Sequence, residues 1–165
     1  MATTKKNLLI LKKTRRKPDQ GDIFVFQLES LPDRYFFGRV VATDTTIGGI
    51  TDIGVILIYL YRISSQDKKA IPDLQISDLL TPPIGTNAMP WTKGYFEVVH
   101  SGENSPDDLL TQHCFYSPFR KCYFDEYGNS LPTKVEPVGM YGLSGLGSID
   151  NEISKALGIP TVATN

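Results

Sequence analysis

Few side chains in this sequence are of the types that most often bind metals or act as nucleophile and base: His100, His113, Cys114 and Cys122. Structural zinc sites rely on spacings such as CxxC or HxxxH, and neither joins these residues. His113 and Cys114 are neighbours in a stretch that predicts a strand, so their side chains point to opposite faces. The same geometry argues against the two as base and nucleophile. A pairing of His100 with Cys122 stays open, because catalytic partners need not be close in sequence.

Several carboxylates lie in loops beside turn residues. Glu103, Asp107 and Asp108 fall in a stretch that contains glycine and proline, and Asp125 and Glu126 precede a Gly-Asn turn. Two neighbouring acids do not make a glycosidase pair without a defined separation, which a sequence does not give. From the residues alone we expect solvated surface groups, no catalytic residue, no metal and no cofactor.

A glycine-rich segment, VGMYGLSGLGSID at 138–150, lies between a predicted strand and a predicted helix. Glycine-rich loops in that position can cradle phosphates. The spacing here is G-x-x-G-x-G rather than G-x-G-x-x-G, and no Lys-Ser/Thr pair follows. We interpret the segment as a tight loop whose glycines take positive backbone angles, so that the last helix turns back onto the sheet.

The charge distribution is uneven. Seven of the 17 Lys and Arg residues precede the first acidic residue, Asp19, so residues 1–17 carry +7. The remaining ten, set against all 18 acidic residues, leave residues 18–165 at −8. Such a body repels nucleic acid and attracts basic partners. The basic segment itself predicts a solvated arm or edge strand, and an arm that binds nucleic acid is the alternative.

Hydropathy and cysteine content indicate the cellular compartment in which the protein works. The longest apolar stretch, at 54–61, has eight residues, whereas a membrane-spanning helix needs about 20. Two cysteines are too few for the disulfide framework of a small secreted module. We therefore expect a protein of the reducing cytoplasm that neither spans nor attaches to a membrane.

The arrangement of apolar residues indicates a sheet. The runs at 23–28, 35–43 and 55–63 predict three strands, with a hairpin turn at 31–33. Gly38, inside the second run, indicates a bulge or a close backbone approach. We expect a small, strongly bent antiparallel sheet or open barrel, in which the single tryptophan, Trp91, plugs the core; an exposed binding anchor is the alternative for Trp91.

The rest of the chain predicts shorter elements. Strands are expected at 95–99, 114–117, 121–125 and 137–141. The last element is a helix capped by Ser148 or Asp150 and ended by Gly158. At 165 residues the whole chain suits one mainly β (α+β) domain, at 18–165, behind a basic arm at 1–17, with its one convincing helix packed on the sheet.

The motif content resembles a known family. KPDQGDIFVFQL at 17–28 followed by YFFGRVV at 35–41 resembles the opening of immunity protein family 26 of the bacterial polymorphic-toxin systems. WTKGYFE at 91–97 is similar to that family's W-x-x-G-x-F element, and FDEYGN and YGLSGLGSIDNEISKALG are similar to the ends of its longer members. The likeness covers roughly residues 12–158. It implies a non-catalytic cytoplasmic protein that binds a cognate toxin, often a nuclease, encoded by an adjacent gene.

The resemblance assigns no binding residues, so the contact surface is predicted from charge. A nuclease needs a basic rim around its active site, and a body at −8 can cover such a rim and exclude the substrate. We therefore expect the loop carboxylates to contact the toxin, with tyrosine anchors beside them. The predicted contact residues are Glu103, Asp107, Asp108, Asp125, Glu126, Tyr116 and Tyr127.

Two other functions remain as alternatives. The opening strand also resembles that of ribonuclease toxins of the PemK and MazF type, which would make Arg39, with Thr43 or Thr45, the catalytic residues. The acidic body opposes binding of RNA. The second alternative is a nucleic-acid or ribosome-associated module that binds through the basic arm.

Overall fold

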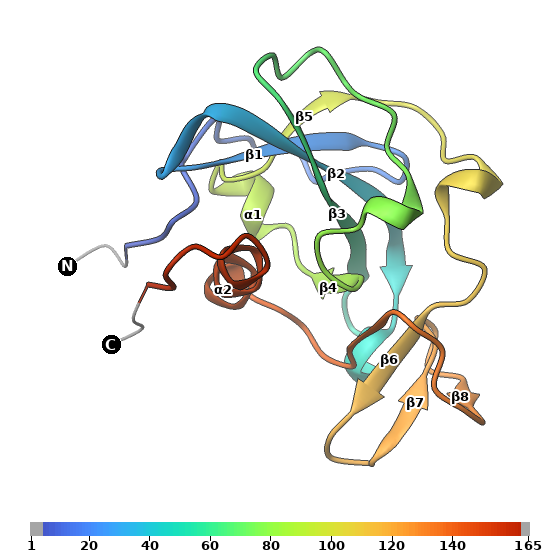
Figure 1. The fold of residues 1–165 in the computed structure, drawn as a ribbon. Helices are drawn as coiled ribbons and strands as arrows, with labels where there is room; N and C mark the ends of the chain where they lie inside the picture. Colours follow the sequence, from blue (N-terminus) through green and yellow to red (C-terminus); the bar gives the residue numbers. More distant parts are fainter. Residues whose placement is uncertain (1–4, 163–165) are drawn as a thin grey trace.

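The computed structural model describes residues 5–162, which form two β-sheets and a C-terminal helix (Figure 1). The larger sheet is antiparallel, with strand order β4-β3-β2-β1-β5. Its two edge strands, β4 and β5, do not pair with each other, so the sheet is bent but does not close into a barrel. The five strands are β1 (Ile23–Leu28), β2 (Leu31–Thr45), β3 (Val55–Ser65), β4 (Ile84–Thr86) and β5 (Glu97–His100).

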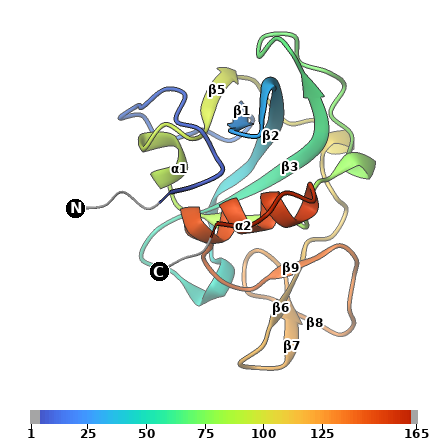
Figure 2. The ribbon, with the colours of Figure 1, turned by 60° about the vertical axis from the view of Figure 1, so that its left-hand side comes forward.

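The smaller sheet extends from the larger one and has strand order β8-β7-β6-β9 (Figure 2). Three of its strands are antiparallel neighbours, and β9 runs parallel to β6. Its strands are β6 (Cys114–Ser117), β7 (Cys122–Phe124), β8 (Ser130–Leu131) and β9 (Val138–Met140).

The helices are short except for the last one. Three 3₁₀ turns lie in the connections, at η1 (Ile47–Gly49), η2 (Ile76–Asp78) and η3 (Pro106–Asp108), and α1 is a single turn at Met89–Thr92. The main helix, α2 (Leu146–Ala156), lies across the larger sheet (Figure 2). Among residues 5–162, no helix has the length and hydrophobicity that a membrane span requires.

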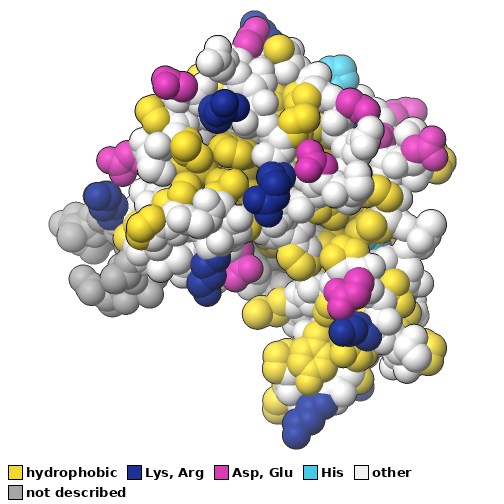
Figure 3. Space-filling view, viewed as in Figure 1, with side chains coloured by type: hydrophobic (Ala, Val, Ile, Leu, Met, Phe, Trp, Pro, Cys, Tyr) yellow, Lys and Arg dark blue, Asp and Glu magenta, His cyan; other side chains and the backbone are white. Residues whose placement is uncertain are grey.

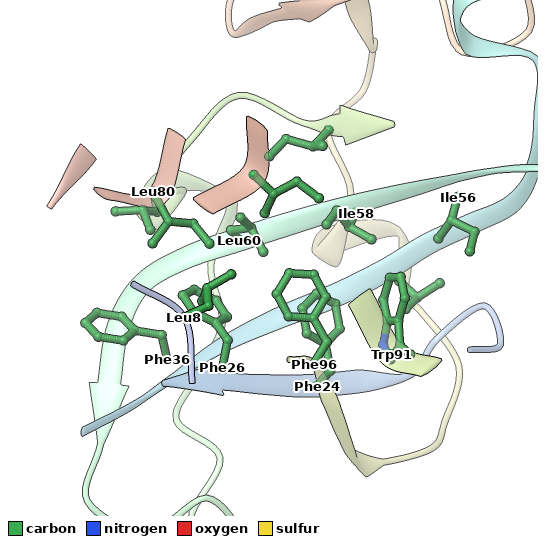
Figure 4. Close-up of a cluster of buried hydrophobic side chains, with 14 of the residues drawn as sticks. Leu8, Phe24, Phe26, Phe36, Ile56, Ile58, Leu60, Leu80, Trp91 and Phe96 are labelled. Atoms are coloured by element: carbon green, nitrogen blue, oxygen red, sulfur yellow. The ribbon is translucent and has the colours of Figure 1, made fainter. Parts of the chain in front are cut away.

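The larger sheet is buried on both faces, which explains why β1 is apolar except at Gln27 and why β3 is apolar from Val55 to Tyr61. Successive residues of a strand point to opposite faces, and Ile23 and Phe24 accordingly belong to two separate core clusters. On one face, α2 contributes Ile149 and Ile153 to a core of aromatic and aliphatic side chains (Figure 4). On the other face, loops and Phe115 of the smaller sheet cover the strands.

Trp91 is fully buried in this first core, which confirms the prediction of a core plug. Its ring packs edge-on against Phe24 and Phe96, with centroids 5.2 Å away in each case. Phe24 also stacks on Phe96 at 4.5 Å. Gly38 of β2 faces this cluster: a Cβ atom built there would lie 2.2 Å from the Phe24 ring. The pairing of β2 with β3 shifts register between Phe36 and Gly38, as the predicted bulge requires, and the close approach at Gly38 is made by an aromatic side chain and not by backbone.

Three local predictions were wrong. The β1–β2 turn lies at residues 29–30, since Leu31 already pairs with Leu28, and residues 31–33 belong to β2. Helix α2 begins at Leu146 after Gly145, earlier than a cap at Ser148 or Asp150 would place it. The glycines of the segment 138–150 do not take positive φ angles.

The N-terminal segment packs on the body of the protein. Leu8 forms an isolated antiparallel bridge with Leu28 at the end of β1. Its backbone N–H donates to Asp150 Oδ1 of α2 at 2.8 Å. The Asn7 side chain donates to Ser154 Oγ, also of α2, at 2.9 Å. Asp150 lies inside α2, beyond the cap position, and its carboxylate binds the N-terminal segment.

Candidate functional site

Three of the predicted contact residues gather around one groove. Glu103 and Asp108 line a cavity of about 350 Å³, and Asp107 and Asp108 line a neighbouring cavity of about 350 Å³. Both cavities are also lined by Asp73 and Leu74, from the loop between β3 and η2. We call the two cavities together the acidic groove. Four carboxylates therefore border it, one of which the sequence analysis did not identify.

Arg39 anchors the connection between β5 and β6 at residues 101–113, which carries Glu103, Asp107 and Asp108 and which we call the acidic loop. Its guanidinium is almost completely buried, and donates to Tyr61 Oη and to Asn104 Oδ1, each at 3.1 Å. It also forms an ion pair with Asp108, at 3.4 Å. The Asn104 amide in turn donates to the carbonyl oxygens of Val40 and Val41 in β2. The arginine of the F-G-R-V motif thus fastens the acidic loop to the larger sheet.

The groove carboxylates differ in their freedom to contact a partner. Asp108 accepts hydrogen bonds from the backbone N–H and the hydroxyl of Ser105, besides its ion pair with Arg39. Glu103 and Asp107 are exposed, and so is Asp73. Asp108 therefore shapes the loop, whereas the other three present their charges to solvent.

The remaining acids lie at the turn between β7 and β8. The Asp125 carboxylate accepts hydrogen bonds from the backbone N–H groups of Tyr127 and Asn129, which fixes the turn. The exposed Tyr127 side chain donates to Asp44 Oδ1 at 3.3 Å. Glu126 points the other way, and its carboxylate contacts His113 Nδ1.

A buried chain of hydrogen bonds joins this turn to the larger sheet. Its members are Glu126, His113 and Tyr59, since His113 Nε2 contacts Tyr59 Oη at 2.5 Å. Tyr59 Oη also accepts the backbone N–H of Leu110 at 3.1 Å, at the end of the acidic loop. We call these three side chains the Tyr–His–Glu chain. It joins β3, the acidic loop and the turn after β7, so it holds both acidic regions to one framework.

Burial raises the pKa of Tyr59 to about 12, because desolvation disfavours the phenolate. In the unfolded chain the phenol loses its proton near pH 10. Between pH 10 and pH 12 the unfolded state therefore binds fewer protons, and the free energy of unfolding falls as pH rises.

Between pH 10 and pH 12 we expect the titration of Tyr59 to lower the free energy of unfolding by about 2 kcal/mol. A full pKa unit corresponds to about 1.4 kcal/mol. Urea unfolding of the wild type and of Tyr59→Phe at several pH values between 9 and 12 measures it. The variant is less stable at neutral pH, but its stability should fall less steeply above pH 10. Equal slopes for the two proteins would contradict the assignment.

The comparisons with known proteins concern the region that holds the groove. A family model described as Immunity protein 26 matches residues 19–118, more than half of the 165-residue chain. The chain belongs to this family. No curated protein and no solved structure matches it.

The match to the immunity protein 26 family extends from just before β1 to just after β6. It includes Arg39 and the whole loop that Arg39 anchors. The strands β7–β9 and helix α2 lie outside the matched residues, as do the motifs noted after residue 118. In this family member the acidic groove therefore lies in the matched part, and the turn at 125–127 lies in an extension of it.

Tyr116, the last predicted contact residue of this immunity protein, lies on the smaller sheet. The register places it beside Tyr123 of β7 and Met140 of β9. Their neighbours in the next row, Phe115 and Phe124, are buried. The row of Tyr116 is thus the outward one, and Met140 is 65% exposed. Hydrophobic side chains gather over this sheet in Figure 3.

The cysteine and histidine candidates are dispersed. Cys114 is buried and Cys122 half-buried, and both thiols are free. His113 belongs to the Tyr–His–Glu chain, whereas His100 is exposed at the end of β5. Within residues 5–162, no three His, Cys, Asp or Glu side chains are grouped as a metal site would require.

The residues nominated for a ribonuclease are engaged in the fold. All the contacts of Arg39 described above are made inside the protein, where its side chain is 9% exposed. Thr45 is fully buried, and its hydroxyl donates to the Val55 carbonyl at 2.8 Å. An arginine that stabilises a reacting phosphate must reach it directly, and this one is covered by the acidic loop.

Proposed function

We propose that this protein binds a cognate toxin of a polymorphic-toxin system and blocks its active site without catalysing a reaction. The toxin that fits best is a nuclease, because a nuclease needs a basic rim to attract phosphate. The observation that carries the proposal is the acidic groove of a family member whose residues 18–165 carry −8. Cytoplasmic binding of the toxin would protect the cell that produces it.

The proposed contact begins at the three exposed groove carboxylates, Asp73, Glu103 and Asp107. Opposite charge on the two surfaces accelerates encounter and excludes substrate from the rim that is covered. Because Arg39 and Asn104 hold the loop against β2, its charges are placed before the toxin arrives. Such preorganisation lowers the entropic cost of association.

The turn at 125–127 supplies a second proposed contact. Tyr127 is 52% exposed and presents an aromatic ring beside Asp44. Tyrosine is frequent among the residues that dominate binding energy at protein interfaces. The full proposed surface comprises Asp73 and five of the residues predicted from the sequence: Glu103, Asp107, Asp125, Tyr116 and Tyr127. The other two predicted residues, Asp108 and Glu126, support this surface by holding the loop and the turn in place.

The experiment measures the affinity for the toxin domain encoded by the adjacent gene, in wild type and in an Asp73→Lys/Glu103→Lys/Asp107→Lys variant. We expect at least a tenfold loss of affinity, about 1.4 kcal/mol or more. Because these side chains are exposed, the urea midpoint of the variant should stay close to that of the wild type.

A matched control makes the same change of charge elsewhere. Glu29→Lys/Asp33→Lys/Asp52→Lys alters three exposed acids that do not line the groove. It should change affinity by less than about threefold, through long-range attraction alone. Undiminished binding by the groove variant would refute this surface, and a protein that never binds the toxin would refute the function.

A further inference from the structure

A third cavity, of about 370 Å³, lies along the free edge of β5. One wall consists of six consecutive residues, 96–101. Because neighbouring residues of a strand point to opposite faces, a cavity that touches all six lies at the edge of the strand. In the described part of the chain, β5 pairs with β1 alone. The outer backbone N–H and C=O groups of β5 therefore border the cavity.

The basic N-terminal segment forms the opposite wall, through Lys12, Thr14, Arg16 and Lys17. Before these residues, the N–H groups of Leu11 and Lys12 donate to the Gly94 carbonyl at 2.7 and 3.1 Å.

After them, the chain is fixed again at a short turn. Asp19 N–H donates to the buried Asp22 carboxylate at 2.9 Å, and Asp22 N–H donates to the Asp19 carbonyl at 3.1 Å. The segment between these two attachments is a strap held away from β5, so the space between strap and strand is preformed.

The charges on the cavity wall define what fits inside it. Lys12 and Lys17 are exposed cations, whereas Arg16 is paired with Asp19. The strand side is partly apolar, with Val98 and Val99 half-buried. A ligand with acidic groups, apolar groups and free backbone hydrogen-bonding groups would match all three features.

Nucleic acid fits this cavity less well than a polypeptide does. A phosphate backbone is charged at every nucleotide, but the carboxylates of Asp22 and Glu97 also line the space. Glu97 is bound to Lys68 at 3.0 Å and remains part of the wall. In a polypeptide the charges are on side chains, which can be directed to the strap while the backbone pairs with the strand.

We propose that an extended acidic segment of a partner protein binds between the strap and β5, as an added strand whose acidic side chains contact Lys12 and Lys17. Strand addition obtains affinity from main-chain hydrogen bonds and specificity from side-chain pockets. This site adjoins the acidic groove, with which it shares His100 as a lining residue, and it requires no toxin. The basic N-terminal segment would then bind an acidic partner, whereas the acidic body is proposed to bind a basic one.

The test uses a fluorescein-labelled decapeptide of alternating glutamate and valine, followed by fluorescence anisotropy at low salt. We expect a dissociation constant on the order of 100 μM, with the largest NMR shifts at the amides of residues 97–101. Lys12→Glu/Lys17→Glu should weaken binding at least tenfold. Lys13→Glu/Arg15→Glu changes the same charge on the same strap outside the cavity lining, and should weaken it less than about twofold.

Two further probes test the mode of binding. A decapeptide of the same charge with its central valine replaced by proline should lose affinity, since proline cannot donate to a strand ladder. A labelled ten-nucleotide thymidine strand should bind more weakly than the peptide. The proposal would be overturned by equal losses of affinity in the two charge variants or by equal affinity for the proline peptide. It would also be overturned by stronger binding of the oligonucleotide than of the peptide, or by no peptide binding at about 1 mM.

Discussion

Replacing Gly38 by alanine is expected to lower the free energy of unfolding by about 2 kcal/mol. The new Cβ would lie 2.2 Å from the Phe24 ring, which is fully buried and held by Phe96 and Trp91. Overpacking of this kind costs about 1–3 kcal/mol. The reduced backbone freedom of the unfolded variant returns about 0.4–1 kcal/mol at most. Urea unfolding followed by tryptophan fluorescence measures the difference.

A double-mutant cycle identifies the cause. Phe24→Leu removes the ring that the alanine would meet, so it should cost less stability in the Gly38→Ala background than in the wild type. Gly147→Ala is the control, because its Cβ would meet nothing within 4 Å inside α2, and it should stabilise the protein by about 0.5 kcal/mol. Additive effects at Gly38 and Phe24 would show that the ring is not the obstacle.

Replacing His113 by leucine should cost about 3 kcal/mol. The change leaves the Tyr59 hydroxyl and the Glu126 carboxylate without the imidazole that lies between them. An unpartnered buried polar group costs about 1–3 kcal/mol, and a charged one costs more. Urea unfolding gives the total, and amide hydrogen exchange should show the largest loss of protection in β6 and β7, where the Tyr–His–Glu chain attaches the smaller sheet.

The other histidine provides the control. His100 is exposed at the end of β5, so His100→Leu should change stability by no more than about 0.5 kcal/mol. In a Tyr59→Phe background, His113→Leu should cost less than it does alone, because part of the chain is already missing. A full cost in both backgrounds would mean that the two side chains act independently.

The sequence predicted those parts of the fold in which burial produces a recognisable local pattern of apolar residues. Residues 55–61 of β3, and all of β1 except Gln27, are apolar because both faces of the larger sheet are covered. The hairpin turn was misplaced because Pro32 is a common turn residue, whereas here it lies just inside β2. Proline is tolerated near the start of a strand, where a missing N–H removes no central ladder bond.

The candidate site was less predictable because its geometry depends on contacts between distant segments. Glu103 and Asp107 were identified from their loop, but nothing in that loop indicates that Asp73 lies across the groove. The role of Arg39 depends on Asn104, which it meets only in the folded chain. Charge composition indicates what kind of partner to expect, whereas the position of the surface follows from how two loops pack.

The position of α2 has a consequence for biosynthesis. The helix supplies Ile149 and Ile153 to the core that also contains Phe24 and Phe26, so β1 lacks part of its cover until α2 has been translated. Until residues 146–156 emerge from the ribosome, one face of the nascent sheet stays uncovered, and exposed apolar surface of that kind favours aggregation and chaperone binding. Ribosome stalling before residues 146–156 have emerged would therefore release chains prone to misassembly.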